Sequence, residues 1–223
     1  MSHQKRIIWL TIFSIAMGFL EAAVVVYLRE LYYPEGFNFP LTSMDIHVAL
    51  TEIGREAATV IMLLGVGMLG GKTPYQRFSF FIASFAIWDI FYYVFLKIIL
   101  DWPASLLTWD ILFLIPVPWV GPVITPVLIS ITMLILAWAI NVRCLQEVSH
   151  SVSRQEWLIL ITGSLLVVGS WTIDYITFSM QRSDSLLAFS SYIPKNYNWF
   201  VFAMGEFTLL FAIYKFWIRT KTK

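Results

Sequence analysis

Long apolar runs, separated by short polar stretches, divide the chain into six segments. A helix needs about 20 mostly apolar residues to cross the hydrocarbon core of a bilayer. The six segments that meet this requirement lie at about 7–28, 46–70, 77–100, 122–142, 155–178 and 197–219. The pattern therefore predicts an all-α integral membrane protein, with residues 1–223 forming a single transmembrane domain built as a six-helix bundle.

A further apolar stretch at 106–120 is too short to cross a bilayer comfortably. It contains Pro116 and Pro118, and Pro122 follows. Proline lacks a backbone N–H and interrupts helical hydrogen bonding, so a regular helix is excluded here. Irregular backbone is tolerated at membrane depth only where protein or a water-filled cavity shields it. We therefore expect a short re-entrant or interfacial segment between the third and fourth helices.

The first apolar run is interpreted as a retained helix. The apolar region of a signal peptide has about 7–15 residues and leads into a cleavage site of small residues. The run at 7–28 is longer, and Glu21 lies where the cleavage features would be expected.

The basic residues predict the orientation, because short cytoplasmic loops are enriched in Lys and Arg. With the N-terminus inside, ten lie at cytoplasmic ends: Lys5, Arg6, Lys72, Arg77, Arg143, Arg154, Lys215, Arg219, Lys221 and Lys223. Five lie on the opposite side or in the outer half: Arg29, Arg55, Lys97, Arg182 and Lys195. This asymmetry predicts a multi-pass protein of the cell (inner) membrane with both termini in the cytoplasm.

Composition narrows the function classes. Only 13% of residues are charged, against about 25% in ordinary soluble domains. The net charge of +1 provides no field that would attract nucleic acid, and the single cysteine, Cys144, permits neither an intramolecular disulfide nor a Cys-based metal site. The lipid bilayer is thus the first expected partner.

Carboxylates inside the predicted spans are the most unusual feature of the chain. They are Glu21, Glu52, Glu56, Asp89, Asp174 and Glu206. A carboxylate at the centre of a bilayer costs about 2.5–3.5 kcal/mol even on the lenient insertion scale. These side chains must therefore face the bundle interior, pair with cations or carry protons.

Helical spacing favours the bundle interior, because residues three or four apart share a face. The polar faces comprise Ser14, Gly18 and Glu21 in the first helix, Asp45, Glu52, Arg55, Glu56 and Thr59 in the second, Asp89, Tyr93 and Lys97 in the third, and Gly163, Ser170, Asp174, Thr177 and Gln181 in the fifth. The small residues of the first helix would permit close approach of a neighbouring helix.

A structural interpretation and a functional one compete for this set. Buried ion pairs are common between helices, and Arg29, Arg55 and Lys97 could neutralise three of the six carboxylates. An acidic excess would remain. That excess indicates a bound cation, shared protons or a wet cavity open to the outside.

Motifs for specific chemistry are scarce. No zinc signature, phosphate-binding loop or nucleophile elbow occurs, and His47, the histidine nearest the carboxylates, points away from Glu52 on a helical wheel. An all-oxygen site for a divalent cation such as Ca²⁺, Mg²⁺ or Mn²⁺ stays open, because hard cations prefer carboxylates. Its candidate ligands are Glu52, Glu56, Asp89 and Glu206.

The stretch from Asp101 to Pro126 permits two interpretations. Trp102 and Trp109 are typical of interfacial anchors. In the alternative, they form a lid over an outer cavity, with Asp101 and Asp110 at its mouth.

The leading hypothesis is a small membrane binding or transport protein for a cation or a small polar or cationic solute. Its cavity would open to the extracytoplasmic side and be formed by Glu21, Glu52, Arg55, Glu56, Asp89, Tyr93, Asp174 and Glu206. One alternative is a membrane-embedded enzyme that uses paired carboxylates on a lipid or quinone-like substrate. Another is an accessory subunit of a membrane complex, and a homo-oligomer is also compatible with the sequence.

Overall fold

The computed structural model describes residues 2–145, 152–181 and 190–219. Within these ranges, six helices are long and apolar enough to cross a membrane. They are α1 (His3–Tyr32), α2 (Ile46–Gly70), α3 (Pro74–Leu100), α4 (Ile124–Leu145), α5 (Arg154–Met180) and α7 (Trp199–Arg219). The six predicted segments are thereby confirmed as helices, and their length and apolar composition suit a multi-pass membrane protein. Of the basic residues used to predict the orientation, Arg182, Lys221 and Lys223 lie outside the described residues.

Polar caps explain where several helices begin. The Ser2 hydroxyl accepts a hydrogen bond from the Lys5 amide at the start of α1, and Thr73 caps α3, which has Pro74 in its first turn. Ser153 and Glu156 form a capping box at the start of α5, in which each side chain accepts a hydrogen bond from the other residue's amide. Such caps satisfy N–H groups that a helix leaves without partners in its first turn.

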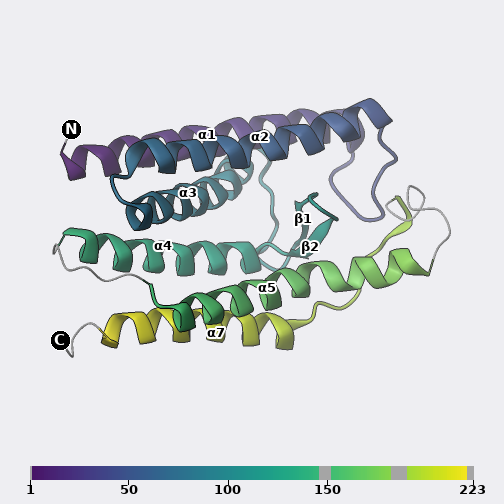
Figure 1. Ribbon diagram of the computed structural model, residues 1–223. Helices are drawn as coiled ribbons and strands as arrows, with labels where there is room; N and C mark the ends of the chain where they lie inside the picture. Colours follow the sequence, from purple (N-terminus) through teal and green to yellow (C-terminus); the bar gives the residue numbers. More distant parts are fainter. Residues whose placement is uncertain (1, 146–151, 182–189, 220–223) are drawn as a thin grey trace.

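The helices form two groups of three. Figure 1 shows α1, α2 and α3 on one side of the bundle and α4, α5 and α7 on the other. The two groups pack together along α3 and α4. The largest hydrophobic core lies among α3, α4, α5 and α7. Both chain ends lie at the same end of the bundle, as an even number of crossings requires.

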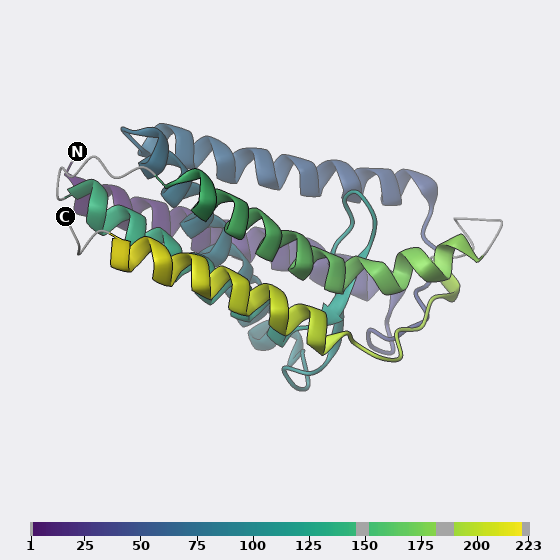
Figure 2. The same cartoon turned by 60° about the horizontal axis from the view of Figure 1, so that its bottom comes forward.

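A β-hairpin occupies the space between the two groups. Strands β1 (Trp109–Phe113) and β2 (Trp119–Pro122) are antiparallel, with an irregularity in register between Ile111 and Phe113. Figure 2 shows the turn of the hairpin extending between α2 and α5. The prediction that 106–120 contains no regular helix is confirmed, although the strands themselves were not predicted.

The hairpin packs closely against α5 and α2. A Cβ atom added at Gly121 would lie 2.9 Å from Cδ1 of Trp171, so only glycine fits at this point of β2 without movement. The rings of Trp119 and Trp171 stack at 5.5 Å. On the other side, the Leu114 amide donates a 2.8 Å hydrogen bond to Glu56 of α2. The hairpin therefore connects the two groups of helices.

Candidate functional site

A cavity of about 480 Å³ is lined by the C-terminal half of α1, the N-terminal half of α2 and the hairpin, with Tyr92 of α3 and Tyr175 of α5. Figure 1 shows these parts of α1 and α2 in the half of the bundle away from the start of α1 and the end of α7. We call this space the large cavity. Its apolar wall includes Val25, Leu28, Leu41, Ile53, Ile111 and Leu114. Its polar groups include Arg29, Glu52, Arg55, Glu56, Tyr92 and Asp110. A mostly apolar wall with a few converging polar groups is typical of small-molecule sites, which measure about 300–1,000 Å³.

Arg55 organises the carboxylates on the α2 side of the large cavity. Its Nε donates a 2.8 Å hydrogen bond to Glu52 Oε2, and its Nη1 donates to Glu21 of α1. Thr59, one turn further along α2, donates to the same Glu21 carboxylate. The polar face predicted for α2 therefore faces α1, and one guanidinium serves two carboxylates.

Glu56 differs from these neighbours because it forms no ion pair with any described residue. Its Oε2 accepts the 2.8 Å hydrogen bond from the Leu114 amide. The side chain is buried and lines the large cavity. The geometry thus brings a carboxylate without a cationic partner against a mostly apolar space.

The opposite wall holds a second charged group, built from Arg29 and Asp110. Arg29 Nη2 lies 3.5 Å from Asp110 Oδ1, and the Tyr93 hydroxyl donates a 3.1 Å hydrogen bond to Oδ2. The Arg29 guanidinium also lies 3.6 Å from the centre of the Trp102 ring. Burial raises the pKa of Asp110 to about 6, although the Arg29 charge and the Tyr93 hydrogen bond act in the opposite direction.

The other predicted carboxylates lie elsewhere. Asp89 of α3 accepts a 2.8 Å hydrogen bond from Ser130 of α4. Glu206 of α7 accepts one from Thr132 of α4, and its Oε2 is buried without a partner among the described residues. Asp174 lines a separate, smaller cavity. The structure thus brings Glu21, Glu52, Arg55 and Glu56 together but does not bring Asp89, Asp174 and Glu206 into the same cavity.

The four residues considered as a lid also separate. Asp110 lines the large cavity, and Trp102 supports Arg29 from outside it. Asp101 is exposed and pairs with Lys97 at 2.7 Å, which lowers the pKa of the Asp101 carboxyl. Trp109 lines the smaller cavity.

The hypothesis of an oxygen-ligated divalent cation receives no geometric support. Across residues 2–145, 152–181 and 190–219, no group of three or more His, Cys, Asp or Glu side chains is arranged to hold a metal ion. Glu52 and Glu56 lie on successive turns of α2, whereas Asp89 and Glu206 have the separate partners described above.

Arg29 and Tyr92 are among the lining residues of the large cavity that were not predicted as site residues. Arg29 was considered only as a neutralising charge, yet it forms part of the wall. Tyr92 lines the cavity, whereas its predicted neighbour Tyr93 supports Asp110 from behind. The adjacent tyrosines of α3 were the available signal, but helical spacing from Asp89 selected Tyr93 alone.

Comparisons with models of known protein families, with curated proteins and with solved structures found no match for this chain.

Proposed function

We propose that this chain is a membrane binding or transport protein whose large cavity accepts a small solute with a positive charge and an apolar body. The observation that carries the proposal is the position of Glu56. This carboxylate lines the cavity and forms no ion pair with any of the described residues. A buried charge without compensation is costly, so a bound cation would stabilise the site.

The surrounding residues support an amphipathic solute rather than a bare ion. Arg29 and Arg55 already neutralise part of the acidic charge, through Asp110, Glu52 and Glu21. The remaining wall is dominated by aliphatic side chains. A solute with an ammonium group near Glu56 and an apolar chain along α1 and the hairpin would match both parts of the wall.

The proposed orientation places the chain ends in the cytoplasm of a cell whose inner membrane holds the protein. The ten-to-five distribution of basic residues supports this arrangement. The large cavity would then lie in the extracytoplasmic half, and the hairpin would be a re-entrant segment shielded by the two helix groups. Burial of Asp110, Val120 and Val123 in and beside the hairpin supports that role.

The proposal is tested with purified full-length protein in lipid nanodiscs and with hexylammonium as the probe. Hexanol serves as the uncharged control of the same length. We expect hexylammonium to raise the melting temperature in a saturable manner, and hexanol to have little effect. Equal stabilisation by the two compounds, or by neither, would contradict a cation-selective cavity.

A further inference from the structure

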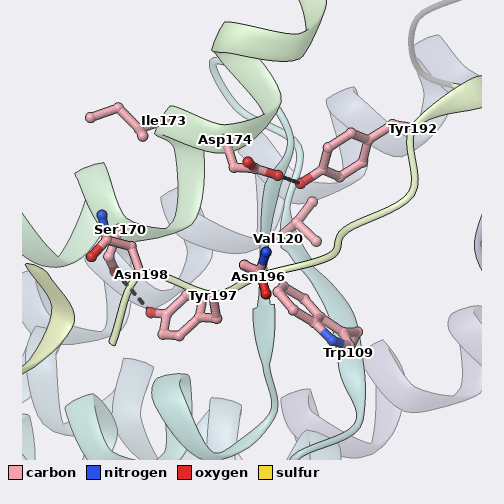
Figure 3. A pocket seen from close by; sticks show the side chains of 9 residues that line it. All are labelled: Trp109, Val120, Ser170, Ile173, Asp174, Tyr192, Asn196, Tyr197 and Asn198. Carbon is pink, nitrogen blue, oxygen red and sulfur yellow. Dashed lines mark hydrogen bonds between the residues drawn. The ribbon is translucent and has the colours of Figure 1, made fainter. Parts of the chain in front are cut away.

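A second cavity, of about 310 Å³, is lined by residues of the hairpin, of α5 and of the segment before α7, none of which lines the large cavity. We call it the small cavity. Figure 3 shows Asp174 and Ser170 of α5 on one side of it, and Trp109 of β1 with Tyr197 on the other. Trp109 and Asp110 are adjacent in β1 and line the small and the large cavity, respectively. The two cavities therefore border the same hairpin but have no lining residue in common.

Asp174 contributes a negative charge to the small cavity. Its Oδ2 accepts a 2.5 Å hydrogen bond from the Tyr192 hydroxyl, drawn as a dashed line in Figure 3. Burial raises the pKa of Tyr192, so its hydroxyl keeps its proton and acts as the donor. Asp174 makes no ion pair in the described part of the chain. A hydrogen bond from a neutral hydroxyl does not neutralise the carboxylate, and Asp174 is exposed, so a cationic ligand can reach it.

Aromatic rings supply the other part of the wall. Trp109 and Tyr197 lie edge to face, with ring centres 6.0 Å apart. The Tyr197 hydroxyl shares a 2.8 Å hydrogen bond with Ser170, which fixes the ring at the edge of the cavity. Tyr192 adds a third ring beside Asp174. Aromatic faces attract cations through the ring quadrupole, and groups of such rings recognise methylated ammonium ions.

The charges of the lining residues restrict the ligand further. No Lys, Arg or His is among the described residues that line the small cavity, so nothing there would compensate an anion. Asn196 and Asn198 provide neutral amide groups for a polar substituent. The cavity volume is at the lower end of the usual range for small-molecule sites. A compact ligand with one positive charge fits this combination of size, charge and aromatic surface.

We propose that the small cavity is a second binding site, separate from the large cavity, for a compact methylated ammonium cation held by Asp174 and by the rings of Trp109, Tyr192 and Tyr197. The carboxylate compensates the charge of the cation, and the rings contact its methyl groups. The hairpin forms the wall shared with the large cavity, so the two sites are adjacent but select ligands of different shape.

The test uses isothermal titration calorimetry on the full chain in nanodiscs, with choline as the probe. The matched control ligand is 3,3-dimethyl-1-butanol, in which an uncharged carbon replaces the quaternary nitrogen of choline. We expect choline to bind and the isostere to bind at least about tenfold more weakly, because it lacks the charge. Asp174→Asn keeps an acceptor oxygen for Tyr192 and should weaken choline binding by about tenfold or more. Equal binding of choline and its isostere, or no change in Asp174→Asn, would overturn the proposal.

A pair of substitutions at Tyr197 distinguishes ring contacts from hydroxyl contacts. Tyr197→Phe keeps the ring and should leave the choline affinity within about threefold, whereas Tyr197→Leu should reduce it by about fivefold or more. Equal losses in both variants would indicate binding through the hydroxyl and contradict the aromatic site. The proposal would also be overturned by a different pattern of ligands. In that pattern the parent protein binds an uncharged polyol such as erythritol but not choline, and Tyr197→Phe no longer binds the polyol.

Glu56→Gln separates this inference from the proposal for the large cavity. The variant should bind choline as the parent does, because Glu56 lines the large cavity and not the small one. Loss of choline binding in Glu56→Gln would assign the cation to the large cavity and refute the second site. Failure of hexylammonium to bind, with choline binding intact, would refute only the proposal for the large cavity.

Discussion

Arg29, in the last turns of α1, and Asp110, in the first strand of the hairpin, form a buried ion pair across 81 positions of sequence. The pair lies in the wall of the large cavity, and Tyr93 of α3 holds the other carboxylate oxygen. One interaction therefore joins α1, α3 and the hairpin, and the shape of the cavity depends on it.

Replacement of Arg29 by Met should destabilise the protein at pH 8 by about 3–5 kcal/mol, because Asp110 would remain buried and charged without its partner. The loss should be smaller at pH 5, where Asp110 carries a proton. Unfolding in mixed micelles at both pH values would measure the difference. Lys97→Met, which removes the partner of the exposed Asp101, is the control and should cost less than about 1 kcal/mol. Equal losses for the two variants would show that the buried pair has no special role.

The raised pKa of Asp110 predicts a pH dependence of stability. The folded protein keeps the proton up to a pH of about 6, whereas the unfolded chain releases it near the ordinary value of 3.8. Between these values the folded state binds more protons, so the contribution of this group to the free energy of unfolding falls as pH rises from about 4 to about 6. Besides burial, the groups that act on its pKa are the Arg29 charge, the Tyr93 hydroxyl and the backbone N–H of Ile111, and all three lower it.

Melting temperatures of the parent and of Asp110→Asn across this range would reveal the effect. The parent should lose stability relative to the variant as pH rises, and the difference should level off above a pH of about 6. A difference that does not vary with pH would contradict the assignment.

Arg55→Met should be more damaging than loss of either carboxylate that Arg55 serves. The substitution leaves Glu21 and Glu52 buried without a cation, at a cost of about 3–5 kcal/mol. Glu52→Gln leaves the pair with Glu21 intact and should cost less. The double variant Arg55→Met with Glu21→Gln should recover part of the loss. If the stability changes of Arg55→Met and Glu21→Gln simply add in the double variant, the two carboxylates do not depend on one shared guanidinium.

The close approach of α1 and α3 depends on Gly18. A Cβ atom at this position would lie 3.0 Å from both the Trp88 carbonyl oxygen and Phe91 Cβ. Gly18→Ala should therefore destabilise the protein by about 1–3 kcal/mol. Gly65 of α2 has nothing within 4 Å of an added Cβ, so Gly65→Ala should be neutral or stabilising, as expected from helix propensity. A larger loss of stability in Gly65→Ala than in Gly18→Ala would contradict this packing.

The sequence was sufficient to predict the helices, because each span carries its own apolar signal. It also predicted the polar face of α2, since Glu52, Arg55 and Glu56 follow one helical repeat. The hairpin was not predicted, because 106–120 is almost uniformly apolar and lacks the alternation of a half-exposed strand. The prolines indicated only that a helix was excluded.

The sequence did not predict how the carboxylates are distributed between the two cavities, because helical spacing describes one helix at a time. Helical spacing places Glu52 and Asp174 on inward faces, but it does not say that the two side chains line different cavities. The contribution of Tyr197 was missed because it falls at the start of the last predicted span, whereas α7 begins at Trp199.

The role of Glu56 in cation binding is tested most directly by comparing the affinity of the parent protein and of Glu56→Gln for hexylammonium, both in nanodiscs. Glu30→Gln, at an exposed position in the last turns of α1, is the matched control. We expect Glu56→Gln to weaken hexylammonium binding by about tenfold or more and Glu30→Gln to leave it unchanged. Unchanged affinity in Glu56→Gln, with the melting temperature of the unliganded protein preserved, would contradict the account.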